Sequence, residues 1–246
     1  MRLTIPMLPP EEKYNYIKLN KTMDLQEDAY MANPTIAVMA GTHIDTEFGA
    51  TLARNLTDHI ISIPISNTPE EQTLFQTMDD TRRLQKIRDV ISQHSDISCL
   101  LVYCNSLSGS VDFKSLSKEC GIHIITPLDF YSHIATQYTS FGIITANAQG
   151  SAGIEKSILD ENARARIYSI SNLDWVDAVE ANATPASIYE ELGLREAIGV
   201  YEKLQVDCIV LGCTHFPYFQ DYLQEQTKLA CISPDQYILN ELTKCL

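Results

Sequence analysis

Two cysteines of this chain each follow an apolar, β-type run and precede small hydrogen-bonding side chains. Cys104 follows the run Cys99–Tyr103, and Cys213 follows the run Asp207–Gly212. In a parallel α/β protein the carboxyl ends of strands are where ligands bind and active sites form. Two thiols at two such ends suggest a reaction with two mirror-related halves.

Inversion of the α-carbon of an amino acid is a reaction that needs two such groups. One base must remove the α-proton, and an acid on the opposite face of that carbon must return one. We expect Cys104 and Cys213 to share these roles and to exchange them for the other enantiomer. Because a free thiol has a pKa of about 8.5, only a few per cent is thiolate at neutral pH. The site must therefore hold groups that favour the thiolate.

Hydrogen-bonding and titratable residues near the two cysteines are candidates for this support. We expect Asp45 to act as a proton-relay partner of Cys104, and His215 as one of Cys213. No pyridoxal cofactor is evident, so protein donors must stabilise the negative charge that spreads onto the α-carboxylate. Side chains that we expect to bind this carboxylate are Asn105, Ser106 and Thr214.

Strands and helices are predicted to alternate from Thr35 onward, which indicates a parallel α/β architecture. The predicted strands are Ile36–Ala40, His59–Ile65, Cys99–Tyr103, Ile122–Ile125, Phe141–Thr145, Arg166–Ile170, the run before Cys213, and Leu229–Ile232. The predicted helices are Glu47–Leu56, Glu70–Gln93, Gly109–Lys118, Asp129–Gln137, Ala152–Asp160 and Ala186–Leu204, one after Pro217 and one from about Pro234.

An internal repeat predicts two similar Rossmann-like lobes. The run Ile36–Thr42 matches Phe141–Asn147 at an offset of 105 residues, and the two cysteines are 109 residues apart. We expect a pseudo-two-fold axis between the lobes, with the active site in the cleft and Asn147 lining it. The predicted division is a 1–33 extension, a first lobe of 34–127 plus 217–246, and a second lobe of 128–216.

Composition narrows the class of protein. The formal net charge is −14, which argues against a broad basic face for nucleic acid or an anionic membrane. The sequence has no long apolar run and no signal-peptide pattern at its start, so we expect a cytoplasmic protein. Its seven cysteines include no Cys-x-x-Cys pair, and Cys213 with His215 lacks further ligands nearby. We therefore expect no metal site.

The segments Tyr103–Ser106 and Gly212–Pro217 resemble the two signature motifs of the cofactor-independent aspartate/glutamate racemases. The resemblance extends from about Thr35 to the carboxyl terminus. It implies two α/β lobes with the active site between them, two catalytic cysteines and an acidic amino acid as the small-molecule substrate. It also implies no metal and no pyridoxal phosphate, and commonly a homodimer.

The resemblance gives two indications of the substrate. Cys-Thr-His-Phe-Pro is similar to the glutamate racemase branch, which usually has Asp-Ser in its first loop. Here that loop is Gly41–Thr46, and it contains no Asp-Ser pair. Thr42 and Asp45 are the nearest candidates for the role of that aspartate. Lys156 is similar in placement to a lysine that aspartate racemases use beside the substrate, although the arginine they carry after the second strand is replaced by Ser66–Glu70. We expect aspartate first and glutamate next.

Other interpretations remain open. The same architecture hosts hydantoin racemases, decarboxylases and cis–trans isomerases, and a catalytically silent homologue would bind an acidic amino acid without exchanging its α-proton. Asp45 or Thr46 can be the cap of the helix that follows, which is the commoner role of such residues. His43 can be solvated or face the substrate, and Lys156 can be an exposed helix residue.

Overall fold

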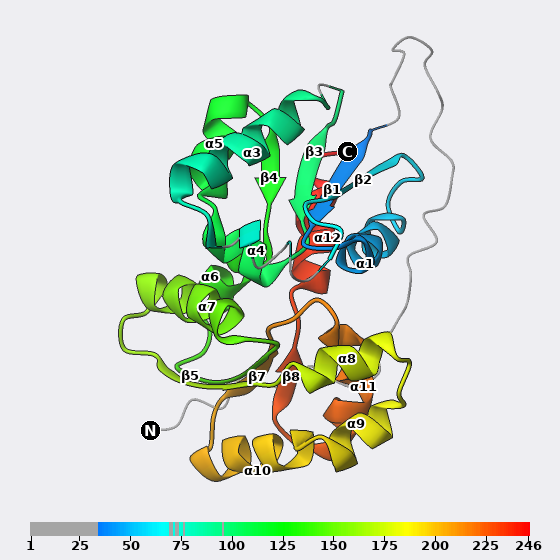
Figure 1. The fold of residues 1–246 in the computed structure, drawn as a ribbon. Coiled ribbons are helices and arrows are strands. Elements are labelled where there is room, and N and C mark those ends of the chain that lie inside the picture. Colours follow the sequence, from blue (N-terminus) through cyan, green and yellow to red (C-terminus); the bar gives the residue numbers. More distant parts are fainter. Residues whose placement is uncertain (1–33, 69–70, 72–73, 76, 95) are drawn as a thin grey trace, which may run out of the picture. The chain divides into compact units, whose positions relative to one another are not determined.

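The computed structural model describes residues 34–68, 71, 74–75, 77–94 and 96–246 (Figure 1). The predicted 1–33 extension therefore lies outside the described residues. In the described part of the chain, no helix has both the length and the apolar character needed to cross a membrane.

The first lobe is built on a parallel sheet with the strand order β2-β1-β3-β4. Its strands are β1 (Ile36–Ala40), β2 (Ile60–Pro64), β3 (Cys99–Val102) and β4 (His123–Ile125). The helices between them are α1 (His43–Ala53), α3 (Asp80–Ser92), α4 (Asn105–Ser110) and α5 (Phe113–Cys120). Every residue of β1 and β3 is buried, which explains why these strands are continuous apolar runs in the sequence.

The second lobe repeats this topology with the order β6-β5-β7-β8, again all parallel. Its strands are β5 (Ser140–Thr145), β6 (Arg166–Ser171), β7 (Cys208–Leu211) and β8 (Ala230–Ile232). The remaining helices are α6 (Pro127–Ile134), α7 (Ala148–Glu161), α8 (Asp174–Glu180), α9 (Pro185–Glu191), α10 (Leu194–Leu204), η1 (Phe216–Phe219), α11 (Gln220–Gln226) and α12 (Asp235–Thr243). The predicted pair of similar α/β lobes is confirmed.

Alternating side chains of the central strands pack on opposite faces of each sheet. In β1, Met39 shares a core cluster with Ile87 of α3, whereas Val38 shares one with Leu242 of α12. The same alternation separates the two clusters of the second sheet. Each lobe is therefore a three-layer sandwich with helices on both faces, the arrangement in which ligands bind at the carboxyl ends of the strands.

The predicted boundary at residue 217 differs from the observed strand pairing. β8 pairs with β7, so the segment that contains η1, α11 and β8 belongs to the second sheet. Only α12 returns to the first lobe, where the Tyr103 hydroxyl donates a hydrogen bond of 2.8 Å to Asp235. Strand pairing across a crossover is a non-local interaction, and nothing in the local pattern of residues 217–232 identified its partner sheet.

Two predicted helices are each divided in two. Residues 105–120 form α4 and α5, because Val111 is extended and Asp112 caps the second helix through Ser115 N–H. Residues 185–204 form α9 and α10, which are separated at Gly193 with a φ of 76°. A positive φ favours glycine, so this residue marks the break. The predicted helix Glu70–Gln93 is also interrupted: the described residues 71, 74–75 and 77 are helical, and α3 begins at Asp80 after its N-cap Asp79.

Candidate functional site

A cavity of about 180 Å³ lies at the carboxyl ends of the central strands of both sheets, with residues of both lobes in its walls. Nine of the ten predicted site residues line it: Thr42, Asp45, Cys104, Asn105, Ser106, Asn147, Cys213, Thr214 and His215. The tenth, Lys156, does not. The volume suits a ligand smaller than a drug-sized molecule, such as a single amino acid.

Cys104 enters the cavity from the first lobe. It stands two residues after the last residue of β3 and is the N-cap residue of α4, with 6% of its surface exposed. Burial, and after it the charge of Asp45, raise the pKa of this thiol to about 11. The Ser106 hydroxyl, 3.4 Å from Sγ, and the backbone N–H groups of Leu107 and Gly41 act in the opposite direction. A pKa raised in this way favours the thiol over the thiolate at neutral pH.

Cys213 enters from the second lobe, two residues after the end of β7. Its Sγ lies 3.7 Å from Nδ1 of His215. Burial is again the main reason why the pKa of this thiol is raised, and the charges of Asp45 and of Cys104 raise it too. Both sulfurs line one cavity, so a charge on Cys104 raises the pKa of Cys213.

His215 is held between two carboxylates. Its Nε2 lies 3.0 Å from Oε1 of Glu180, and its Nδ1 lies 3.5 Å from Oδ1 of Asp45. The ring is 4% exposed and packs edge-on against Phe48 at 5.0 Å between centroids. A neutral imidazole has one N–H to donate, whereas a protonated one can donate to both carboxylates at once. Both ring nitrogens of His215 therefore face a carboxylate, and Nδ1 also faces the sulfur of Cys213.

Asp45 reaches from α1 across the cavity to the second lobe. Its Oδ1 accepts a hydrogen bond of 3.5 Å from Thr214, and its Oδ2 accepts bonds from the backbone and hydroxyl of Thr42. Burial raises the pKa of this carboxyl, while His215 and Thr42 lower it. The predicted cap at Asp45 or Thr46 is wrong: Thr42 is the N-cap, and Asp45 is the third helical residue of a capping box.

Asn105 places a buried donor in the wall of the cavity. The hydroxyl of Tyr131 donates to its Oδ1 at 2.8 Å, which fixes the orientation of the amide. Its Nδ2 is buried and has no hydrogen-bond partner among the described residues. An unpaired buried donor is costly unless a ligand accepts from it, so Nδ2 is suited to bind an oxygen of a ligand.

Thr42 and Asn147 occupy equivalent positions in the two lobes. Thr42 caps α1 after β1, and Asn147 caps α7 after β5 by accepting a hydrogen bond of 2.9 Å from Gly150 N–H. Both residues line the cavity. The internal repeat that matched them in the sequence therefore reflects matching positions in the fold.

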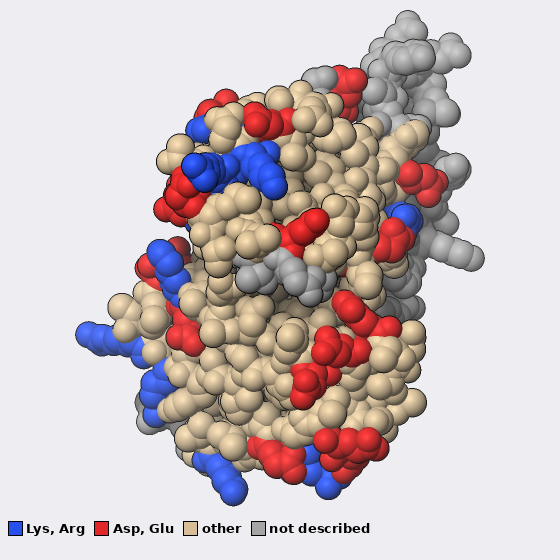
Figure 2. Space-filling model, in the orientation of Figure 1, with Lys and Arg blue, Asp and Glu red and all other residues tan. Residues whose placement is uncertain are grey.

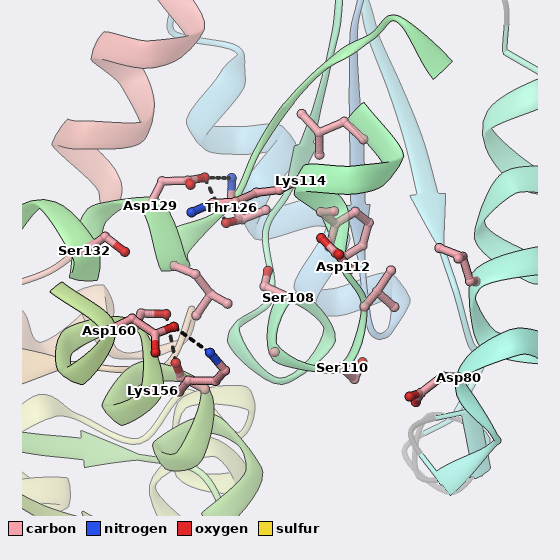
Figure 3. A pocket seen from close by; sticks show the side chains of 18 of the residues that line it. Asp80, Ser108, Ser110, Asp112, Lys114, Thr126, Asp129, Ser132, Lys156 and Asp160 are labelled. Carbon is pink, nitrogen blue, oxygen red and sulfur yellow. Dashed lines mark hydrogen bonds and ion pairs between the residues drawn. The ribbon is translucent and has the colours of Figure 1, made fainter. Parts of the chain in front are cut away.

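Lys156 lies away from the cavity and close to a larger one. Its side chain is 74% exposed and forms an ion pair of 2.5 Å with Asp160 of the same helix. Both residues line a cavity of about 730 Å³ between α4, α5, α6 and α7 (Figure 3). Lys156 lies outside the lining of the cavity that holds both cysteines, because α7 begins at Ala148 and its buried face, with Gly150 and Ile154, is turned away from Lys156.

Several residues of the site were not predicted, and two of them carry charge. Asp177 and Glu180 line the cavity from α8, a helix for which no prediction was made. The local sequence does contain a pattern typical of an amphipathic helix here. Trp175, Val176 and Val179 form its buried apolar side, and the acidic residues lie on the other side. His43 lies outside the cavity lining, and its Nε2 is 3.3 Å from Oδ1 of Asn67.

The next question is whether side chains of the described residues could hold a metal ion or pyridoxal phosphate. Among the residues that the structure describes, no group of three or more His, Cys, Asp or Glu side chains has an arrangement suited to a metal ion. No lysine lines the described cavity, so the residue that would bind pyridoxal phosphate as a Schiff base is missing from it.

Comparison with known families places these observations in context. The Asp/Glu/Hydantoin racemase family matches residues 40–242. Among curated proteins, the glutamate racemase of Pediococcus pentosaceus is 24% identical over 144 residues, which are 57% of this chain and 52% of that protein. The chain thus spans about half the length of the curated relatives that it matches.

Solved structures show the same fold. The glutamate racemase of Francisella tularensis in complex with D-glutamate has a TM-score of 0.68 at 20% identity, and covers 86% of this chain and 80% of its own. The allantoin racemase of Klebsiella pneumoniae has a TM-score of 0.57 at 15% identity, with 85% and 86% covered. At these identities the likeness shows a shared fold and leaves the substrate to the residues of the cavity.

Proposed function

The chain belongs to the Asp/Glu/Hydantoin racemase family, and from this premise we propose that it racemises an acidic amino acid by two-base chemistry with Cys104 and Cys213. The observation that carries the proposal is that the two thiols line one cavity from equivalent strand ends of two similar sheets. A substrate α-carbon between them has one sulfur on each face. This is the geometry that removal of a proton from one face and its return to the other requires.

One thiol must become a thiolate when the substrate binds. Burial disfavours both thiolates, so the positive ammonium group of a bound amino acid would favour the charged sulfur. On the second side, the His215 imidazole is close enough to exchange a proton with Cys213. On the first side, Ser106 and backbone N–H groups solvate the sulfur of Cys104. The mechanism thus uses a titratable relay on one face and fixed donors on the other.

The carbanion must also be stabilised. As the α-proton leaves, negative charge spreads onto the α-carboxylate, and donors aimed at that group lower the barrier. Asn105 Nδ2 is a buried donor without a partner among the described residues, and Thr214 lies on the opposite lobe. These residues are our candidates for binding the carboxylate, with Ser106 beside them.

The position of Lys156 outside the cavity lining changes which acidic amino acid we propose as the substrate. The expectation of aspartate rested on a lysine beside the substrate, and neither Lys nor Arg is among the described lining residues. Without a lysine in the lining, the observation that favoured aspartate over glutamate is removed. The curated relatives are glutamate racemases as well. We therefore put glutamate first and aspartate second. Assembly as a homodimer stays a prediction.

The test is proton exchange in heavy water. The purified full chain, freed of metal and pyridoxal phosphate, is incubated in D₂O with L-glutamate, L-aspartate or a 5-substituted hydantoin. Chiral chromatography with mass detection then follows the product. A D-amino acid with one α-deuterium is expected. Exchange on the hydantoin alone would move the protein to another substrate within the family, and no exchange on any of the three would contradict the proposed racemase.

A further inference from the structure

The carboxylates of the 180 Å³ cavity differ in how they are engaged. Three acidic residues line it: Asp45, Asp177 and Glu180. Asp45 accepts hydrogen bonds from both lobes, and Glu180 is paired with His215. The carboxylate of Asp177 has no hydrogen bond or ion pair with any residue that the structure describes. Asp177 therefore offers an unused acceptor to whatever enters the cavity.

The helix that carries Asp177 is firmly packed. Trp175 is 1% exposed, donates from Nε1 to the backbone oxygen of Leu192 at 2.9 Å, and stacks edge-on against Phe216 at 5.8 Å. Asp177 and Glu180 are three residues apart and lie on the same side of the helix, facing the cavity. Figure 2 shows acidic side chains gathered over α8 on the face drawn. The position of Asp177 is thus set by a rigid element.

The other walls of the cavity supply donors. Asn105 is 5% exposed, and its unpartnered Nδ2 belongs to the lining of the same cavity. Thr214 and Gly150 also line the cavity, where the Thr214 hydroxyl donates to Asp45 and the Gly150 N–H donates to Asn147. The cavity therefore has a donor side at α4 and an acceptor side formed by α8.

This polarity matches the groups of an amino acid. When the two thiols occupy the two faces of the α-carbon, its remaining substituents are the carboxylate, the ammonium group and the side chain. The carboxylates require donors, and only the ammonium group requires an acceptor. We propose that Asp177 binds the α-ammonium group of the substrate and so turns the α-carbon toward the two thiols. This inference rests on the proposed function, and it assigns to Asp177 a binding role in it.

The test compares two ligands that differ only in the ammonium group. For glutamate the partner ligand is glutarate, and for aspartate it is succinate. In Asp177→Asn, KM for the amino acid is expected to rise about three- to tenfold, the effect of losing one partly solvated charge pair. The inhibition constant of the dicarboxylate is expected to stay the same or fall. The turnover number should fall as well, because the α-carbon is then less well oriented toward the two thiols, so kcat/KM should fall by more than KM rises.

Asp174→Asn is the matched control. Asp174 lies one turn before Asp177 on the same helix, carries the same charge and does not line the cavity. If both variants change both ligands alike, the effect is the net charge of α8, and the proposal is overturned. It is also overturned if Asp177→Asn leaves the KM of the amino acid unchanged.

A binding measurement separates this inference from the proposed function. Calorimetry with D-glutamate and glutarate on the full-length chain needs no turnover. A silent protein that still shows the ligand contrast in Asp177→Asn would contradict the racemase and support the ammonium site. A wild-type protein that binds neither ligand would overturn the ammonium site as well.

Discussion

The two thiols stand at equivalent positions of two similar lobes, yet their surroundings differ. Cys104 is followed by Asn105 and Ser106, and the Ser106 hydroxyl lies 3.4 Å from its sulfur. Cys213 has His215 at 3.7 Å, and that ring continues to Glu180 at 3.0 Å. The repeated topology places the sulfurs, whereas the loops after β3 and β7 decide which side chains surround each one. Symmetry of the fold therefore does not extend to the groups beside the thiols.

The largest effect is expected when one thiol is removed at a time, which tests whether the two cysteines have separate roles. In Cys104→Ser and Cys213→Ser, racemisation is expected to fall by about 10³-fold or more, because a serine hydroxyl is a far weaker acid and base at neutral pH. The remaining thiol can still remove and return a proton on its own face. Each variant should therefore exchange the α-proton of one enantiomer only, and the two variants should exchange opposite enantiomers.

Deuterium uptake measured separately on L- and D-substrate checks this expectation. Cys120→Ser serves as the control, since Cys120 is a partly exposed residue at the end of α5 that does not line the cavity. Uptake into the same enantiomer in both variants would contradict the placement of the sulfurs on opposite faces. Full racemisation in either variant would contradict the two-base mechanism.

The second largest effect on turnover is expected from replacing His215, the imidazole that lies beside Cys213. His215→Gln removes the titratable group beside Cys213 and leaves Glu180 without its partner. We expect the turnover number to fall by about 10²-fold, a typical contribution of a general acid–base group. For a racemase the equilibrium constant is one, so kcat/KM must remain equal in the two directions. The difference between the two sides should appear in kcat and KM separately, measured from each enantiomer by polarimetry.

Asp45 couples the two sides and gives a smaller, pH-dependent effect. Its charge raises the pKa of both thiols. Asp45→Asn removes that charge, so both thiol pKa values should fall, and Cys104 should become reactive at a lower pH than in the wild type. Iodoacetamide alkylation of Cys104 against pH, read by peptide mass spectrometry, measures the shift. Asp58→Asn, at an exposed position outside the cavity lining, should leave it unchanged.

The parts of this comparison that the sequence predicted are local ones. Buried parallel strands are continuous apolar runs, so β1, β3, β5 and β7 were predicted within a residue or two, and with them the strand ends that carry Cys104 and Cys213. The parts that were missed depend on non-local packing. Glu180 and Asp177 come from a short helix whose orientation is set by Trp175 against Phe216. No local pattern identifies that contact.

Lys156 gives the smallest expected effect and shows the limit of motif spacing. A residue a few positions after a strand end can lie near a ligand, but the phase of the helix decides which way it points. Lys156 is 74% exposed and paired with Asp160, outside the cavity that holds the thiols. Lys156→Ala should leave kcat and KM within about twofold of wild type. It should cost less than about 0.5 kcal/mol of stability, because an exposed i,i+4 ion pair contributes little. A tenfold rise in KM for aspartate, with stability unchanged in denaturant titration, would instead mean that α7 turns this lysine toward the substrate when the cavity is filled.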